Sequence, residues 1–244
     1  MTTTLTQAPV GVPLIVSHIS GGAFAERMSR LGLYQGAGLT RLNAGVAVEP
    51  VKIRGVKGDA ILSGWLAGQV VIHLDDGRLL PLPECSPHDK GHVEGITGRT
   101  EVETALHELG IVENDYIEMV RRMPPMRYTF SVNGRGSFQM DESTAAHLLG
   151  ITPGGQIQFS SVGLGEVFTV SSILPGGGAQ SALASLNIKE GSILVLTSVA
   201  ISQPLAFSRD HPVACVTKPG LRLYFREEDA GNIHVDFEAS TQDH

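Results

Sequence analysis

The sequence predicts a mainly β fold made of three tandem units, each a small barrel or a pair of packed sheets with one short helix. Two observations lead to this prediction. One short motif recurs three times along the chain at nearly constant spacing, which is the mark of an internal repeat. In addition, 29 glycines and 13 prolines interrupt the 244 residues, a frequency that suits short strands joined by turns. Hydrophobic residues make up 42% of the chain, which is enough for folded cores.

The recurring motif starts with a leucine, and its three copies are 78 and then 77 residues apart, at Leu31, Leu109 and Leu186. Glycine or asparagine occupies the next position, where a helix commonly ends in left-handed backbone. A second turn residue stands five positions after the leucine. The turn residues are Gly32, Gly110 and Asn187 at the first turn and Gly36, Asn114 and Gly191 at the second.

A short helix is predicted before each leucine. Apolar residues stand seven and three positions before it, and this spacing places them on one stripe of a helix. Each helix is therefore expected to end near the leucine. The apolar pairs are Phe24 and Met28, Val102 and Leu106, and Ala179 and Leu183.

Strands are expected after each second turn, around Leu39, Ile117 and Leu194. Asn133-Gly134, between two alternating runs, is a strong hairpin signal. The proline-rich stretch 81–88 is interpreted as a linker, and residues 1–12 and 238–244 as loose tails. Further strand-like runs are 46–48, 51–53, 60–62 and 70–72, then 128–132 and 137–140, and then 213–216, 221–225 and 233–235.

Composition excludes several classes of protein. The formal net charge of −7 disfavours a nucleic-acid binder or a protein drawn to an anionic membrane. The longest apolar run, near residues 193–201, is far shorter than the roughly 20 residues that a membrane span needs. The first residues show no signal peptide, so we expect a cytoplasmic protein with both cysteines reduced. No catalytic motif is apparent, and we expect a protein that is not an enzyme.

The repeats resemble the ferrous-iron transport protein A (FeoA) domain. The first repeat carries the resemblance at 19–22, 27–36 and 50–55, with its glycine pair, its short helix ending in Leu-Gly-Leu, and a proline before a basic strand. The second keeps 109–111 and 117–122, and the third keeps 176–178, 186–188 and 225–230. Asn114 and Asn187 depart from the pattern, which has glycine there. The resemblance implies three tandem FeoA-like domains with SH3-like barrels, at 13–84, 90–161 and 162–238.

The resemblance also implies a function. FeoA-like proteins are cytosolic accessory factors of ferrous-iron uptake that act on the membrane permease, whose cytosolic part carries a GTP-binding domain. We therefore expect a protein partner of that kind. The same barrel occurs in metal-responsive repressors, but this chain has no basic, helix-rich segment that would read DNA. The expected binding surface is the rim formed by the first short helix and its following loop, around Arg27, Arg30, Tyr34 and Gln35, because exposed tyrosine and arginine often anchor interfaces.

The alternative function is binding or sensing of a transition metal, Fe(II) or Zn(II). Within eight residues the chain places one thiol, two imidazoles and one carboxylate, at Cys85, His88, Asp89 and His92. Such a donor set suits either ion. A polar linker that happens to hold histidines would look the same. Six of the other seven histidines, His18, His73, His107, His147, His211 and His234, are scattered and do not recur at equivalent positions of the three repeats.

Overall fold

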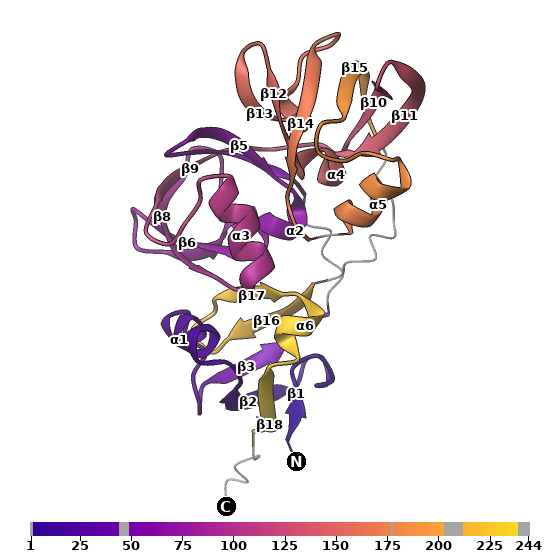
Figure 1. Ribbon diagram of the computed structural model, residues 1–244. Coiled ribbons are helices and arrows are strands. Elements are labelled where there is room, and N and C mark those ends of the chain that lie inside the picture. Colours follow the sequence, from indigo (N-terminus) through magenta and orange to yellow (C-terminus); the bar gives the residue numbers. More distant parts are fainter. Residues whose placement is uncertain (1, 44–48, 177, 203–211, 239–244) are drawn as a thin grey trace, which may run out of the picture.

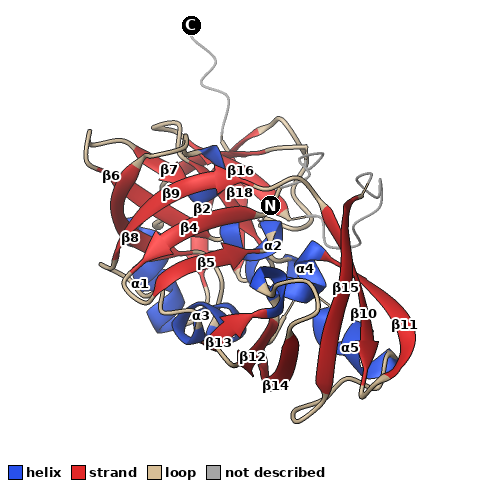
Figure 2. Ribbon diagram, turned by 90° about the horizontal axis from the view of Figure 1, so that it is seen from above, coloured by secondary structure: helices blue, strands red, loops and turns tan. Residues whose placement is uncertain are grey.

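The structure is a computed structural model that describes residues 2–43, 49–176, 178–202 and 212–238. In these residues the strands form three six-stranded antiparallel sheets, which we call sheets A, B and C (Figure 1). Sheet B lies between the other two (Figure 1). Strands dominate and every described helix is short (Figure 2), so the prediction of a mainly β protein is confirmed.

Sheet B is made by one continuous stretch of chain, from residue 51 to residue 122. Its strand order is β5-β4-β9-β8-β6-β7. The elements are β4 (Val51–Gly55), β5 (Gly58–Leu62), α2 (Gly64–Ala67), β6 (Val70–Leu74), β7 (Leu79–Pro81), η1 (Leu82–Glu84), β8 (Lys90–Ile96), α3 (Thr100–Glu108) and β9 (Tyr116–Arg122).

Sheet C repeats this arrangement in residues 126 to 201. Its strand order, β11-β10-β15-β14-β12-β13, is that of sheet B. The elements are β10 (Met126–Val132), β11 (Arg135–Asp141), α4 (Glu142–Ala146), β12 (Leu148–Thr152), β13 (Gly155–Gln158), η2 (Phe159–Ser161), β14 (Val167–Ile173), α5 (Ala179–Ser185) and β15 (Ile193–Ile201).

Sheet A joins the two ends of the chain. Its order, β1-β18-β2-β3-β16-β17, matches the other two sheets strand for strand, with β1 in the place of β7 and β13. The units that carry sheets B and C are inserted between β3 and β16. The elements are β1 (Thr3–Thr4), β2 (Pro13–Ile19), α1 (Gly22–Arg30), β3 (Gly38–Arg41), β16 (Val213–Thr217), β17 (Arg222–Phe225), α6 (Glu227–Ala230) and β18 (Ile233–Phe237).

The sheets are offset by about half a unit from the repeats in the sequence. Each sheet takes its strand–helix–strand part from one repeat and its other strands from the repeat before it, with the third repeat completing the first. The segments 13–84, 90–161 and 162–238 therefore describe the sequence repeat, whereas the sheets follow another division of the chain.

Two details of the expected organisation are wrong. Residues 81–88 are not a linker, because they contain the end of β7 and helix η1 and bury Leu82 and Cys85 in the core of sheet B. The residues before 13 are not a loose tail, since β1 pairs with β18 and Leu5 is buried. In both segments the apolar side chains outweigh the turn-forming composition. The strand expected at 46–48 lies outside the described residues, as does most of the tail expected at the C-terminus.

The three sheets share one irregularity of register. Between Val71 and Ile72 the pairing of β6 with β8 shifts, which leaves Glu94 as an extra residue in β8. The equivalent pairings shift at the same place and leave Ser171 in β14 and Ser17 in β2. A bulge of this kind re-aims a side chain. The shared bulge also allows residues of the three sheets to be matched one by one.

The predicted helices and turns are confirmed. Helices α1, α3 and α5 end at the motif leucines, and the residues after them adopt left-handed backbone, with φ of +83° at Gly32 and +57° at Asn187. Barrel closure is not confirmed: in the described pairings each strand order is linear, and no pairing joins its two ends. No described helix has the length and apolarity that a membrane span requires.

Each sheet has a hydrophobic core, and neighbouring sheets also share apolar side chains. Val71 of β6 belongs to the core of sheet A, and Leu149 and Leu174 of the unit around sheet C belong to the core of sheet B. Gln158 donates a hydrogen bond to the carbonyl of Ile61 and accepts one from its amide, each at 2.8 Å. Because buried amides need partners, this pair fixes how sheets B and C meet.

Candidate functional site

The end of α1 turns one side chain inward and the next outward. Leu31 closes the helix, Gly32 takes left-handed backbone, and the amide of Leu33 donates to the carbonyl of Met28 at 2.8 Å. Leu33 is completely buried, whereas Tyr34 keeps 56% of its surface exposed. The local backbone therefore presents an aromatic ring to solvent on a well-anchored turn.

Tyr34 stands between two shallow hollows. The larger one, of about 410 Å³, is lined by Tyr34, Gly36, Lys218 and Glu238 among others. The smaller one, of about 230 Å³, is lined by Tyr34, Gln35 and residues of α1 and β2. Tyr34 and Gln35, two of the four residues expected to bind a partner, thus lie on one accessible surface. We call it the Tyr34 surface.

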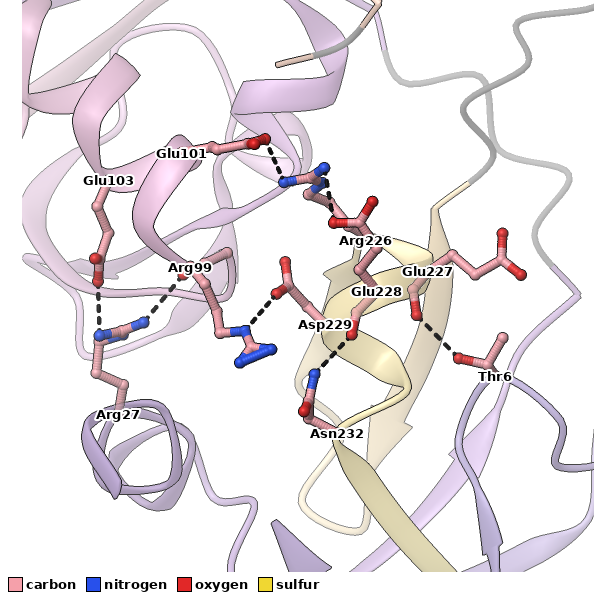
Figure 3. A network of polar contacts seen from close by, with 11 residues as sticks. Thr6, Arg27, Arg99, Glu101, Glu103, Arg226, Glu227, Glu228, Asp229 and Asn232 are labelled. Carbon is pink, nitrogen blue, oxygen red and sulfur yellow. Dashed lines mark hydrogen bonds and ion pairs between the residues drawn. The ribbon is translucent and has the colours of Figure 1, made fainter. Parts of the chain in front are cut away.

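The two arginines expected beside them form ion pairs with other residues of the chain. The guanidinium of Arg27 pairs with Glu103 at 2.6 Å and donates to the carbonyl of Gly98 at 3.1 Å (Figure 3), and its side chain is 13% exposed. Arg30 pairs with Glu113 at 2.5 Å. Both acidic partners come from the unit of sheet B, so these two ion pairs hold α1 against that unit.

A second polar group ties α6 to the same unit (Figure 3). Arg226 pairs with Glu101 at 2.8 Å and with Glu228 at 3.0 Å, and it lies over the ring of Trp65. Arg99 pairs with the buried Asp229 at 3.1 Å. Burial raises the pKa of Asp229, and the nearby Arg99 opposes that rise. Sheet A is therefore held to sheet B by ion pairs around both of its helices.

The structure does not bring together the four metal ligands expected from the sequence. Cys85 is buried with its thiol 3.8 Å from the carbonyl of Pro81, and burial raises its pKa to about 12. The thiol lies in the core of sheet B, whereas the rings of His88 and His92 are exposed to solvent. Asp89 accepts a hydrogen bond from the amide of Ser86, and the ring of His88 lies 79% exposed beside Glu118.

The fourth expected ligand, His92, lies in a different cluster. His92 of β8 is paired directly across the sheet with His73 of β6, and their rings are 5.0 Å apart. Glu94, two residues further along β8, places Oε2 3.3 Å from Nε2 of His92 and 3.5 Å from Nδ1 of His73. Among the described residues this is the one group of three side chains with metal-ligand spacing.

Sequence reasoning missed His73 and Glu94. The spacing His92-Val93-Glu94 places two donors on one face of a strand, which was a usable signal. His73 could not be added to them, because the pairing of β6 with β8 joins residues almost twenty positions apart. No local sequence pattern indicates this pairing. The bulge at Glu94 was also invisible in the sequence.

Comparison with known proteins gives one family relation. The model of the FeoA domain matches residues 80–150, less than a third of the chain. The matched segment runs from β7 to β12 and so covers parts of sheets B and C. No curated protein and no solved structure matches the chain.

Proposed function

We propose that this protein is a non-enzymatic accessory factor of ferrous-iron transport that works in the cytoplasm by binding a protein partner. The match of the FeoA domain to residues 80–150 is the observation that carries this proposal. The partner we propose is the cytosolic, GTP-binding domain of a ferrous-iron permease. A protein partner is favoured over nucleic acid because the net charge is −7.

The Tyr34 surface is the proposed contact. An exposed tyrosine flanked by hollows supplies apolar area and a hydroxyl at low cost in side-chain entropy, which is why such residues anchor interfaces. Tyr34 is held by the buried Leu33 and by the turns on either side of it. The ring is therefore pre-positioned, and binding orders little else.

The three repeats do not offer the same contact. The positions three residues after the motif leucine are Tyr34, Val112 and Lys189. An aromatic, an aliphatic and a cationic side chain cannot fill the same pocket of a partner. We infer that the end of the molecule formed by sheet A makes the contact and that the other units support it.

A binding assay tests the proposal. The immobilised permease domain is titrated with the wild-type chain and with Tyr34→Ala, which we expect to bind at least about tenfold more weakly because an interface anchor is removed. Val112→Ala is the matched control at the equivalent turn and should bind like wild type. Arg30 is left unchanged, since reversing its charge would break the pair with Glu113.

Two outcomes would contradict the proposal. If the wild-type chain does not bind the permease domain, the proposed partner is wrong. If Tyr34→Ala and wild type bind equally well, the surface is wrong.

The alternative function, metal binding, finds no support at Cys85 or His88 for the reasons given above. It finds support at the cluster of His73, His92 and Glu94.

A further inference from the structure

The outer face of sheet B carries three metal-ligand side chains side by side. Strand residues alternate between faces, so His92 and Glu94 share the face opposite to the buried Val93. His73 joins them from β6, because it is paired directly with His92. The side chains are 40%, 42% and 25% exposed for His73, His92 and Glu94, so an ion can reach all three from solvent.

The distances between the donor atoms are compatible with a shared ion. The carboxylate oxygen of Glu94 lies 3.3 Å and 3.5 Å from the two ring nitrogens, beyond the usual range of about 2.7–3.2 Å for N–H···O bonds. Two ligands of a tetrahedral ion with bonds of about 2.0–2.1 Å are separated by roughly 3.3 Å. All three donor atoms lie within 4.8 Å of one another. The three donors are therefore close enough to share one ion.

The donor chemistry points to a divalent transition metal. Two imidazoles and one carboxylate suit zinc and ferrous iron, and three protein ligands leave at least one position for water. Calcium and magnesium prefer oxygen ligands throughout. The site would therefore be open to solvent and exchangeable, unlike a closed structural zinc site.

Comparison of the three sheets shows that the fold itself does not require this set. Because the bulge recurs, the positions of His73, His92 and Glu94 correspond to Ile151, Thr169 and Ser171 in sheet C. In sheet A they correspond to Asp236, Ile15 and Ser17. Sheet C forms the same bulge and the same pairing without a single imidazole. A polar row that merely solvates the sheet would need no such combination of donors in one unit.

We propose that His73, His92 and Glu94 form a binding site for one divalent transition-metal ion, zinc or ferrous iron. The bulge residue Glu94 bridges the two rings, and the direct pairing of β6 with β8 sets their separation. This inference does not depend on the proposed partner, because it is tested on the isolated chain.

The test uses protein purified without an affinity tag and freed of metal with a chelator. Zn²⁺ is titrated against a chromophoric competitor, and Fe²⁺ is titrated in the same way without oxygen. We expect one ion per wild-type chain. His92→Ala and Glu94→Gln should each weaken binding at least about tenfold, and His73→Ala with His92→Ala should abolish it. His88→Ala, an exposed histidine four residues away, is the matched control.

The outcomes separate the possibilities. Loss of binding in the His73 and His92 variants, with His88→Ala unchanged, supports the site. Binding by less than about one tenth of the chains, or equal binding by wild type and the double variant, overturns it. Loss in His88→Ala or in Cys85→Ser, with the double variant unchanged, also overturns it. Circular dichroism of each variant shows that it is folded, which is expected because all three positions are partly exposed.

Discussion

At the scale of single residues, Glu142 at the start of α4 occupies an unusual environment for a carboxylate. Its carboxylate is buried and accepts a hydrogen bond from the hydroxyl of Tyr128 at 2.9 Å, while its other oxygen has no partner. Burial raises the pKa of Glu142 to about 7, the hydrogen bond and Arg121 lower it, and Asp141 raises it further. The carboxyl is therefore half protonated near neutral pH.

This environment predicts a stability that depends on pH. Above the ordinary pKa near 4.5 the unfolded chain releases this proton, while the folded chain keeps it until about pH 7. The folded state thus binds more protons in that window, and stability falls as the pH rises through it. We expect the free energy of unfolding of Glu142→Gln to equal that of wild type near pH 4. At pH 8 we expect it to be higher than that of wild type by up to about 3 kcal/mol. Thermal unfolding at both pH values measures the difference.

The exposed Glu190→Gln is the control for that comparison, and it should leave both melting temperatures unchanged. An equal change of stability for Glu142→Gln at both pH values would show that ionisation of this carboxyl does not affect stability.

The residue scale also shows how far sequence reasoning reaches. The left-handed positions at Gly32 and Asn187 were predicted, because they depend on backbone preferences of single residues. The ligands His73 and Glu94 were missed, because their meeting depends on a pairing between distant strands. The same limit explains why the ion pairs of Arg27 and Arg30 were not expected: their partners Glu103 and Glu113 lie more than seventy positions away.

At the scale of elements, the turn after α1 decides whether Leu33 is buried and Tyr34 is exposed. Gly32 has φ of +83° with open space around the position of a Cβ atom. Gly22, the first residue of α1, has equally open space and ordinary backbone. Substitution of each by alanine therefore separates backbone strain from steric crowding.

We expect Gly32→Ala to lower the free energy of unfolding by about 1–2 kcal/mol, because alanine is strained in left-handed backbone. Gly22→Ala should be neutral or stabilising by up to about 1 kcal/mol, because alanine favours helix. Chemical denaturation of both variants measures the difference. Equal effects would mean that the turn does not require left-handed backbone at Gly32.

Element positions were predicted well, and their partners were not. The leucine motif and the apolar stripes located α1, α3 and α5, and the Asn133-Gly134 signal located the hairpin of β10 and β11. These features are local. The assignment of strands to sheets is not a local feature. The assumption that each repeat forms its own sheet placed the unit boundaries half a unit away from the boundaries of the sheets.

At the scale of the whole molecule, sheet A holds the N-terminal and C-terminal segments of the chain together. Its strands come from both ends of the chain, and β18 lies between β1 and β2. Ile233 and Val235 of β18 are completely buried in the same core as Met28, Leu31 and Leu33. The C-terminal strand therefore supports the helix and turn that carry Tyr34, about two hundred residues earlier in the chain.

This arrangement predicts that removal of β18 damages the N-terminal region before it damages the middle of the chain. In a chain ending at Asn232, amide hydrogen exchange should accelerate throughout residues 13–41, while residues 126–201 in sheet C keep the protection they have in the full chain. The permease domain should no longer bind, because the Tyr34 surface loses its support. Phe237→Ala, on the exposed end of the same strand, is the control and should leave both regions protected.

Unchanged protection of residues 13–41 in the shortened chain would mean that sheet A does not need its C-terminal strands. Uniform loss of exchange protection over all three sheets would mean that the chain unfolds as one cooperative unit. In that case the ion pairs between α1, α3 and α6 couple the sheets more tightly than the separate cores imply.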